Sequence, residues 1–408
     1  MYKSFYNINI QLDDFYYIFN TISGSLVKFD EKHYINYLSN NFSFFKDSEI
    51  NYLTQKFFLK NDDNNTEVKK IEIDVFNNKL NTFYLTIMPN LACNFNCSYC
   101  YERKDNKKLL KTDYLKIFEI IKNIKCKNLV VMWFGGEPTL NYDDIIRFNP
   151  LIKNYCLENN INFISKMTTN FFLISSNRFD ELLDANIKEF QVTLDGFKNV
   201  HDKYRPLVNG KGTFDVLINN LLSVKKNKKD FLIIIRVNFD NKNDYGEFIR
   251  YLNDNFGDDK RFGFIFRPIE NWDKIERDYT CDTELSEYKY TELTSYALKL
   301  HMNIIDTYLD DFYGCYSMYP NNMVITNNGE IKKCTVNLNS KDNYYGTLDK
   351  YDLSHEWEKF DKCSNCKVFP ICEGGKCKYI KTNFDECSKN ALNKIKMNLM
   401  RIIKNETR

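Results

Sequence analysis

Six short apolar runs alternate with helical patterns in the middle of the chain, and this alternation restricts the fold more than any other feature. The runs cover residues 83–88, 129–133, 162–167, 189–194, 231–237 and 262–266. Helix-capping residues lie between them: Thr112 before 113–124, Ser175 or Ser176 before 177–185, and Thr213 before a helix through 226. Short buried strands that alternate with helices form parallel sheets, so the pattern predicts an α/β fold with a partial (β/α)6 barrel.

Three cysteines, Cys93, Cys97 and Cys100, follow the first run within ACNFNCSYCYE. Three thiolates on one tight loop can bind three irons of a [4Fe–4S] cluster and leave the fourth iron without a protein ligand. Zinc is the main alternative, but structural zinc takes four ligands in paired spacings, and no fourth Cys or His lies nearby. An odd number of cysteines in a large chain also disfavours a disulfide framework.

Polar motifs follow three further runs, where parallel barrels place their chemistry. These are Gly135-Gly136-Glu137-Pro138, Thr168-Thr169-Asn170, and Thr193-Leu194-Asp195-Gly196, the last followed by His201-Asp202-Lys203-Tyr204-Arg205. With the cysteine loop, and in this order, they make residues 82–268 resemble the radical S-adenosylmethionine (SAM) superfamily.

The resemblance implies that Cys93, Cys97 and Cys100 hold the catalytic cluster. Its open iron would chelate the amino and carboxylate groups of SAM, and one electron would cleave SAM to methionine and a 5′-deoxyadenosyl radical. Gly135 and Gly136 would let the backbone approach SAM closely, because neither carries a Cβ.

The same resemblance assigns the remaining SAM contacts. Glu137 would accept a charge-assisted hydrogen bond from the SAM ammonium, and Arg205 could pair with the carboxylate. Tyr99 matches an aromatic residue placed against adenine, with packing as the alternative. The strand-end contacts to ribose or carboxylate would be Thr168, Asn170, Thr193 and Asp195. Turn formation is the alternative for Thr193 and Asp195, and His201 fits a structural role better than a catalytic one.

Residues 315–387 hold seven more cysteines in an arrangement similar to the SPASM domain, which carries two auxiliary [4Fe–4S] clusters. By position, Cys363, Cys366, Cys372 and Cys387 would hold the outer cluster, and Cys315, Cys334 and Cys377 the inner one. Cys281 could complete the inner cluster, or its fourth iron is open to substrate. Four residues separate Cys372 from Cys377, where the family usually has three. A pair of zinc sites is the alternative.

The N-terminal segment differs from the barrel. Runs at 6–10, 14–18 and 24–29 predict a small β-meander, residues 34–40 and 47–58 predict helices, and 61–65 a polar turn. This segment resembles the small winged-helix modules that bind leader peptides by adding them to a sheet edge. A structural cap is the alternative. The expected domains are residues 1–80, the barrel at 81–306 and a SPASM domain at 307–408.

Composition excludes several function classes. A net charge of +2 gives no general attraction to nucleic acid, and the lysine-rich residues 225–229 fit a solvated helix end. No apolar run is long enough to span a membrane, and the N-terminus is not a signal peptide. Thirteen cysteines without an export signal indicate metal binding in the reducing cytoplasm.

These features predict an enzyme that abstracts hydrogen from a ribosomally made precursor peptide and forms a thioether or carbon-linked crosslink. A flavodoxin or ferredoxin would supply the electron. The auxiliary clusters would take up the substrate electron or bind a substrate thiolate. Two alternatives stay open: an anaerobic sulfatase maturase, against which Thr335 counts because those enzymes carry a carboxylate there, and a non-catalytic iron–sulfur electron carrier.

Overall fold

The computed structural model describes residues 1–61, 81–102, 104–269, 283–305, 316–318, 321–353, 362–372 and 384–406. The chain forms two compact units. Unit 1 contains Met1–Asn78, Thr307–Met318 and Glu356–Arg408, and unit 2 contains Lys79–Asp306 and Tyr319–His355. These units do not coincide with the three expected segments, because residues 307–408 are divided between them.

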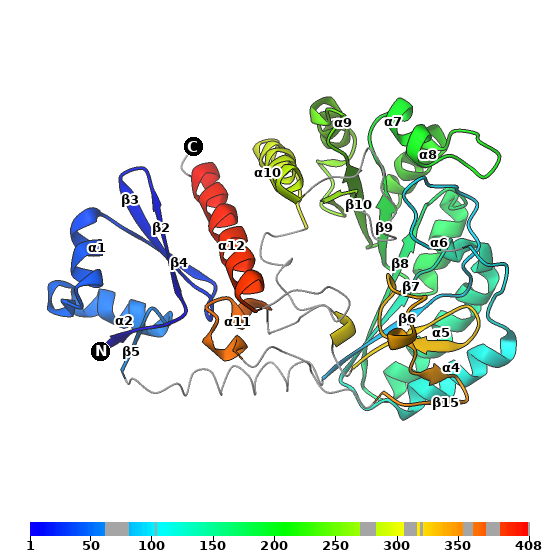
Figure 1. Cartoon of the computed structure of the whole chain (residues 1–408). Coiled ribbons are helices and arrows are strands. Elements are labelled where there is room, and N and C mark those ends of the chain that lie inside the picture. The colour runs from blue at the N-terminus through cyan, green and yellow to red at the C-terminus, as the bar shows by residue number, and fades with distance from the viewer. Residues whose placement is uncertain are drawn as a thin grey trace. The chain divides into compact units, whose positions relative to one another are not determined.

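Unit 2 is built on a ten-stranded sheet in the order β11-β10-β9-β8-β7-β6-β12-β13-β14-β15. Six neighbouring parallel strands follow the chain order (Figure 1), and they are β6 (Thr82–Ile87), β7 (Asn128–Trp133), β8 (Asn162–Thr169), β9 (Glu189–Thr193), β10 (Leu232–Phe239) and β11 (Phe262–Pro268). The alternating α/β pattern is therefore confirmed, and the large sheet of parallel strands is consistent with the open barrel expected.

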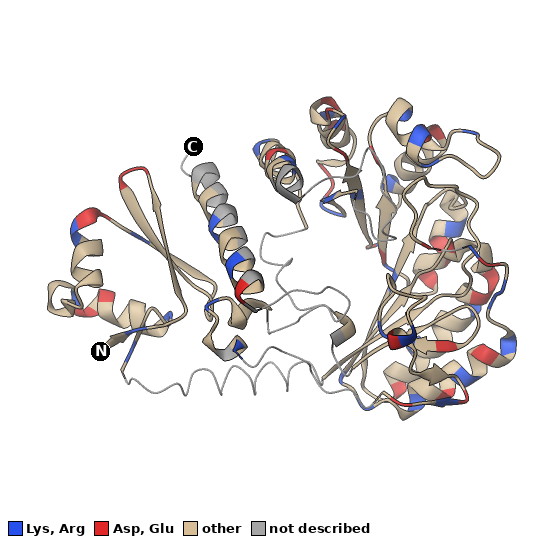
Figure 2. Ribbon diagram, viewed as in Figure 1, with Lys and Arg blue, Asp and Glu red and all other residues tan. Residues whose placement is uncertain are grey.

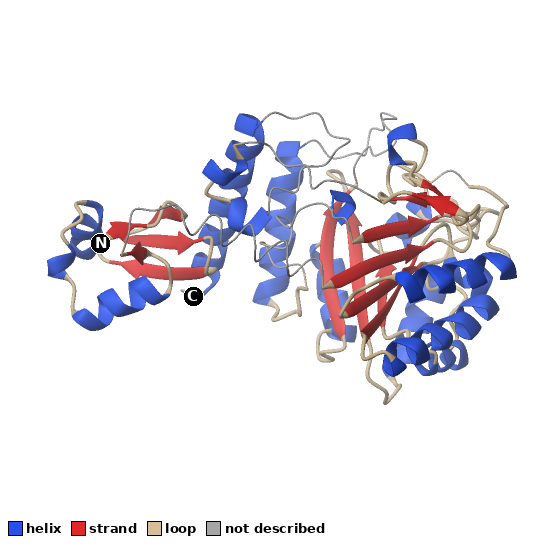
Figure 3. Cartoon of the chain, turned by 90° about the horizontal axis from the view of Figure 1, so that it is seen from below, coloured by secondary structure: helices blue, strands red, loops and turns tan. Residues whose placement is uncertain are grey.

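Helices flank this sheet (Figure 3). They are α4 (Lys111–Asn123), α5 (Tyr142–Glu158), α6 (Ser176–Asp184), α7 (Lys198–Tyr204), α8 (Phe214–Lys225), α9 (Gly246–Phe256) and α10 (Thr283–Lys299), with the short η2 (Pro138–Asn141) before α5. Lys and Arg are interspersed with Asp and Glu over these helices (Figure 2), and the net charge of the chain is only +2.

Two of the three predicted helix starts are confirmed. Ser175 Oγ accepts from the Arg178 amide at 3.4 Å and caps α6, and α8 begins directly after Thr213. The predicted cap at Thr112 is wrong. Helix α4 already begins at Lys111, because the Asp113 carboxylate accepts from the amide of Leu110 at 2.7 Å and ties the first turn together.

Residues beyond the barrel extend the same sheet. Strand β12 (Asn322–Ile325) pairs in parallel with β6, and β13 (Glu330–Lys332), β14 (Gly346–Thr347) and β15 (Lys350–Tyr351) follow as antiparallel neighbours. A short turn, η5 (Lys341–Asn343), lies between β13 and β14. These backbone hydrogen bonds explain why residues 319–355 belong to the barrel unit rather than to a separate C-terminal domain.

Unit 1 contains the predicted meander, an antiparallel sheet of β2 (Asn7–Leu12), β3 (Phe15–Asn20) and β4 (Ser25–Phe29). Its other elements are β1 (Tyr2–Lys3), β5 (Leu59–Lys60), α1 (Glu31–Leu38), η1 (Phe42–Phe44), α2 (Asp47–Gln55), η4 (Tyr316–Met318), η6 (Cys363–Asn365), α11 (Phe369–Cys372) and α12 (Phe384–Glu406). One face of the sheet packs through Ile18 and Phe29 against Tyr37, Leu53 and neighbouring residues of the N-terminal helices.

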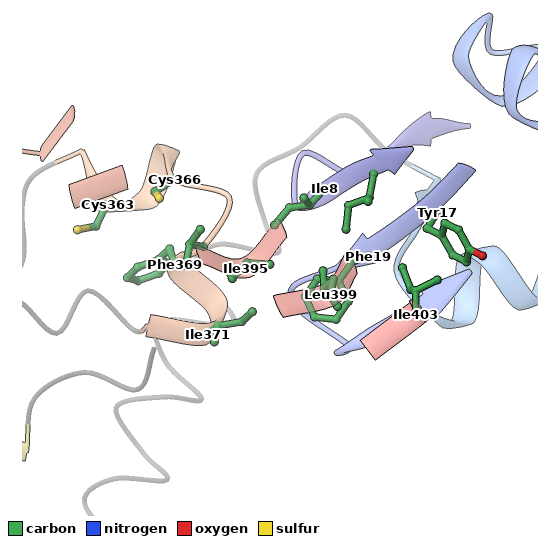
Figure 4. Close-up of a cluster of buried hydrophobic side chains, with 12 residues drawn as sticks. Ile8, Tyr17, Phe19, Cys363, Cys366, Phe369, Ile371, Ile395, Leu399 and Ile403 are labelled. Atoms are coloured by element: carbon green, nitrogen blue, oxygen red, sulfur yellow. The ribbon is translucent and has the colours of Figure 1, made fainter. Parts of the chain in front are cut away.

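The other face of the sheet packs against the C-terminal residues of the chain (Figure 4). We call this group the terminal-helix cluster: Ile8, Ile10, Tyr17 and Phe19 from the sheet, with Cys363, Cys366, Val368, Phe369, Ile371, Ile395, Leu399 and Ile403. The pairs Ile8–Phe19 and Ile10–Tyr17 lie directly opposite each other on β2 and β3, so period-two alternation directs all four side chains to the same face.

Some expectations lie outside the described residues. These are the placements of Cys281, Cys315 and Cys377 and of the polar turn beyond Asn61. Among the helices that the structure describes, none is both long and apolar enough to cross a membrane.

Candidate active site

A cavity of about 170 Å³ opens where β7, β8, β9 and β10 end. Ten of the predicted site residues line it: Cys93, Cys97, Tyr99, Cys100, Gly135, Gly136, Thr168, Asn170, Thr193 and Arg205. Glu137 and Asp195 are fully buried and are not among the lining residues. Carboxyl ends of parallel strands meet at one edge of a sheet, which explains how motifs more than 100 residues apart share one cavity.

Backbone pairing holds the cysteine loop in place. The Asn96 amide donates to the carbonyl of Pro206 at 2.7 Å, the Ser98 amide donates to that of Tyr204 at 2.9 Å, and Phe95 forms a bridge with Leu207. The loop after β6 is thus anchored to the segment after α7. The three thiols therefore face the cavity from a loop fixed at several points, as a preorganised metal site requires.

Burial favours the protonated form of the three thiols. Burial raises the pKa of Cys93 to about 12 and that of Cys100 to about 11, and it also raises the pKa of Cys97. The Arg205 charge opposes this rise at all three. Metal binding must displace these protons, because only thiolates ligate iron. Three thiols on one cavity wall, with a guanidinium that favours their charged form, fit an iron–sulfur cluster with one open iron.

The two glycines after β7 lie against the backbone that leads into the cysteine loop. A Cβ on Gly136 would lie 2.2 Å from the carbonyl oxygen of Ala92, and one on Gly135, whose φ is +114°, would lie 2.4 Å from that of Asn90. The amide of Glu137 donates to the Ala92 carbonyl at 2.8 Å. The space that a side chain would fill is thus taken by the backbone leading into the cysteines. Both glycines also line the cavity, and their close approach to SAM stays a prediction.

Replacing Gly136 with alanine should displace the cysteine loop. The overlap with Ala92 costs about 1–3 kcal/mol of stability, and a misplaced cluster loop should lower SAM cleavage by about 100-fold. Gly246 is a matched control, since its Cβ would meet nothing closer than 3.4 Å. The measurements are 5′-deoxyadenosine release and thermal unfolding. Equal behaviour of Gly136→Ala and Gly246→Ala would contradict the assignment.

The Glu137 carboxylate is fully used by the protein. Its Oε1 accepts from the Thr139 amide at 3.0 Å, the Thr139 hydroxyl at 2.6 Å and the Thr169 hydroxyl at 2.7 Å, and its Oε2 accepts from the Asn170 amide at 2.6 Å. Burial raises the pKa of Glu137, and these hydrogen bonds oppose that rise. Glu137 thus joins the ends of β7 and β8, and its contact with the SAM ammonium stays a prediction.

The buried carboxylate of Asp195 is also bound within the protein, by the hydroxyl of Tyr99. The Tyr99 hydroxyl donates to Asp195 and accepts from Arg205 at 2.8 Å and from Asn238 at 2.9 Å. Burial raises the pKa of both Tyr99 and Asp195. The hydroxyl of Tyr99 is therefore fixed inside the protein, and its ring lines the cavity, as a residue packed against adenine would require.

His201 is structural, as its sequence context suggested. Burial lowers its pKa well below the ordinary range, so the ring is neutral. Nδ1 accepts from the Asp195 amide at 3.2 Å, which leaves Nε2 protonated beside the Thr213 hydroxyl at 3.1 Å. That hydroxyl donates to the Arg205 carbonyl at 2.7 Å. This series of hydrogen bonds runs from the Asp195 amide through His201 and Thr213 to the Arg205 carbonyl and holds Asp195 and Arg205 in position.

Sequence reasoning missed several lining residues, and they are Phe95, Tyr101, Glu102, Phe134, Thr169, Gln191, Arg236 and Asn238. Burial and the Glu137 charge raise the pKa of Glu102 to about 7. Arg236 and Asn238 occupy alternate positions of β10, and Nε of Arg236 donates to Asn238 at 2.8 Å. Both positions were visible as polar residues at the end of an apolar strand, and Glu102 as an acid two residues after a cysteine.

The C-terminal cysteines differ in burial. Cys334, Cys363 and Cys366 are buried, Cys372 is half-buried and Cys387 is exposed. The amides of Val336 and Asn337 each lie 3.4 Å from the Cys334 sulfur. Within the described ranges, no three Cys, His, Asp or Glu side chains surround a single metal-ion position. Cys126 is half-buried and Cys156 fully buried on α5, the latter as expected of a core residue.

Comparison with known proteins identifies the family. Residues 87–252, which contain the cysteine loop and the ends of β7 to β10, match the family model of the radical SAM superfamily. These residues form a radical SAM domain. Related curated proteins include a cysteine-type anaerobic sulfatase-maturating enzyme of Clostridium novyi, 31% identical over 36% of this chain and 41% of that protein.

A second relative in the superfamily is the radical SAM cyclopropyl synthase TigE of Paramaledivibacter caminithermalis, 24% identical over 53% of this chain and 52% of that protein. An uncharacterized Methanocaldococcus jannaschii protein is 30% identical over 41% of this chain and 58% of that protein. The alignments thus span about half the length of these curated relatives.

Solved structures show the same fold. The structure of anSMEcpe with bound AdoMet matches 80% of this radical SAM chain and 100% of its own, with a TM-score of 0.58 and 18% identity. Streptococcus suis SuiB bound to precursor peptide SuiA matches 92% of this chain and 95% of its own, with a TM-score of 0.54 and 18% identity. At such identity these matches describe architecture only.

Proposed function

We propose that this radical SAM protein modifies a ribosomally made precursor peptide, forming a thioether or carbon-linked crosslink. The observation that carries the proposal is the combination of the thiol-lined cavity with a separate groove beside an edge strand in unit 1. The fold likeness to SuiB, which was solved with a precursor peptide, extends over 92% of the chain and supports this reading. TigE, a cyclopropyl synthase, is a further relative that fits it.

The residues of the cavity would have separate roles in binding the cluster and SAM. Cys93, Cys97 and Cys100 would hold the catalytic cluster, which when bound supplies the electron that cleaves SAM to methionine and a 5′-deoxyadenosyl radical. Tyr99 would pack against adenine, and Arg205 would attract the carboxylate of SAM. The strand-end residues Thr168, Asn170 and Thr193 would bind the ribose or carboxylate and exclude water from the cavity.

The C-terminal cysteines would hold two auxiliary [4Fe–4S] clusters. Cys363, Cys366, Cys372 and Cys387 are proposed for one cluster. Cys334 would serve the other, with Cys315 and Cys377. A flavodoxin or ferredoxin is the proposed reductant.

The proposed leader site is the groove beside β4. This groove, about 370 Å³, lies between the edge strand β4 and helices α1 and α2 and is lined by Val27, Lys28, Phe29, Asp30, His33, Phe45, Ser48, Glu49, Tyr52 and Leu53. Both faces of the sheet are already covered by the chain itself. A peptide can therefore reach this sheet only at an edge, which favours strand addition over docking on a face.

A groove variant tests leader binding without removing the module. Tyr52 is 44% exposed at the groove, and Tyr2 is 48% exposed in the same unit but outside it. Tyr52→Ala should weaken binding of the leader peptide of the precursor by about 10-fold or more, and Tyr2→Ala should leave it unchanged. Isothermal titration decides between them. Equal affinities for the two variants would reject the groove as the leader site.

Sulfatase maturation is the second candidate, because a sulfatase-maturating enzyme and anSMEcpe are among the relatives. Thr335 counts against it, since it occupies the position where a carboxylate base is expected. The two functions differ in product. A crosslinked peptide loses hydrogen and keeps its sulfur, whereas formylglycine formation from cysteine removes the sulfur.

Mass spectrometry of peptide incubated with the reconstituted, reduced protein and SAM therefore separates these functions. Absence of 5′-deoxyadenosine under the same conditions would reject both and support the electron-carrier alternative.

A further inference from the structure

Two arginine side chains line the cavity, and only one of them has an acidic partner in the protein. Nη1 of Arg205 donates to the Tyr99 hydroxyl at 2.8 Å, and its Nε lies 4.0 Å from the Asp195 carboxylate. Arg236, on β10, has no carboxylate within ion-pair distance in the part of the chain that the structure describes. One positive charge on the cavity wall is therefore left without a counter-ion from these residues.

The guanidinium of Arg236 is nevertheless held in a fixed orientation. Its Nε donates to Oδ1 of Asn238 at 2.8 Å, and Nδ2 of Asn238 donates to the Tyr99 hydroxyl at 2.9 Å. The terminal nitrogens of Arg236, Nη1 and Nη2, have no hydrogen-bond partner among the described residues. Two parallel N–H donors of this kind match the two oxygens of a carboxylate. The side chain is therefore preorganised for an anion that a ligand must supply.

A second guanidinium on the neighbouring strand increases the demand for that anion. Asn238 pairs with Arg267 on β11, and paired residues of parallel strands face the same side of the sheet. Burial and the Arg267 charge both lower the pKa of Arg236. Arginine stays protonated at ordinary pH, so the cost of burying its charge is relieved only by a negative partner. The cavity wall at β10 thus favours an anionic ligand.

The position of Arg236 in the sheet indicates which ligand brings the anion. The carboxylate of SAM has its proposed partner in Arg205, and the strand-end motifs proposed for SAM follow β7, β8 and β9. Arg236 lies on the next strand, β10, directly beside Thr193 of β9. It therefore borders the SAM motifs on the side that they leave open. Hydrogen abstraction requires the reacting residue of the substrate to lie in contact with the SAM site, so a substrate group is the ligand that reaches β10.

We propose that Arg236 binds a carboxylate of the substrate peptide next to the residue that is modified. The carboxylate would belong to an Asp or Glu side chain or to the C-terminus of the peptide, and Asn238 would hold the guanidinium in place for it. The inference rests on the proposed function and adds the chemistry of the substrate at one position.

Two blocked amino acids that differ in charge test this site by binding alone. The reconstituted protein is kept oxidised, so that SAM is not cleaved, saturated with SAM, and titrated with N-acetylglutamate α-amide or with N-acetylglutamine α-amide. Isothermal titration should show binding of the glutamate probe that is tighter by about 10-fold or more, because only its carboxylate forms charge-assisted hydrogen bonds with the guanidinium.

Variants of Arg236 locate the effect. Arg236→Met should weaken the glutamate probe by about 10- to 100-fold and leave the glutamine probe and SAM unchanged. Arg236→Lys, which keeps the charge without the planar fork, should recover part of the loss. Arg147→Met is the matched control, because Arg147 is 63% exposed on α5 and lies outside the cavity, and it should change nothing. Iron content verifies that each variant retains its clusters.

Equal affinities of the wild-type protein for the two probes would overturn the carboxylate site, whether or not any variant folds. A 10-fold loss of SAM affinity in Arg236→Met, about 1.4 kcal/mol, would assign the guanidinium to the SAM carboxylate instead. Either result leaves the proposed function standing, because crosslinking is measured separately by mass spectrometry. Failure of the wild-type protein to bind SAM would reject both.

Discussion

Replacing Cys93, Cys97 and Cys100 together with alanine is expected to abolish SAM cleavage and to remove about four irons per chain. The intact protein should carry roughly 12 irons, on the four-iron stoichiometry of three clusters. The three thiols line one cavity and reach it from one anchored loop, so no other described cysteine can replace them there. Without the cluster no electron reaches SAM.

Iron analysis and 5′-deoxyadenosine release after anaerobic reconstitution measure both effects. Cys126→Ala is the matched control, because Cys126 is also half-buried but lies outside the cavity, and it should keep iron and activity unchanged. A triple variant that still produces 5′-deoxyadenosine would show that the catalytic cluster is elsewhere.

Phe19→Ala is expected to lower the free energy of unfolding of unit 1 by about 3–5 kcal/mol. Phe19 is 2% exposed in the terminal-helix cluster, which also contains Cys363 and Cys366. Loosening this cluster should therefore release the outer auxiliary cluster, about four irons, while the catalytic cluster, held by unit 2, remains. Cleavage of SAM in the absence of peptide should persist.

Phe15→Ala on the same strand is the control. Phe15 is 38% exposed and contacts Lys28 at the surface, so its loss should cost about 1 kcal/mol or less. Thermal unfolding and iron content after gel filtration decide the comparison. Full iron retention by Phe19→Ala would show that the sheet does not support the cysteine segment.

The terminal-helix cluster also changes how the N-terminal module can be studied. Deleting residues 1–80 would expose Phe369, Ile395 and Leu399, which now pack against the sheet. Such a deletion would damage the cysteine segment as well as any leader site. Point changes in the groove beside β4 are therefore the informative experiment.

The strands, and the meeting of the cysteine loop with the strand-end motifs, could be predicted from the sequence because each depends on short-range patterns. Apolar runs mark strands, and the ends of parallel strands must meet, which brought Cys93, Gly135 and Thr193 to one place. Burial of Cys156 followed in the same way from its position in a helical pattern.

Sequence could not show which polar residues are satisfied within the protein. Glu137 and Glu102 are both acids near motif residues, and only the hydrogen bonds to Glu137 and the unpartnered oxygen of Glu102 distinguish them. The pairing of strands that lie far apart in the sequence could not be predicted either. Nothing in the local pattern of residues 322–325 shows that they extend the barrel sheet beside β6.

Unit 1 joins segments from opposite ends of the chain, and this has a consequence for biosynthesis. The Thr21 hydroxyl donates to the carbonyl of Lys367 at 2.6 Å, across 346 residues. At roughly 5–20 residues per second, the ribosome needs on the order of tens of seconds to make the intervening chain. During that time Ile8, Ile10, Tyr17 and Phe19 present an uncovered apolar sheet face, while the barrel can already fold. Nascent chains should therefore need a chaperone at their N-terminal sheet until the final helix has left the ribosome.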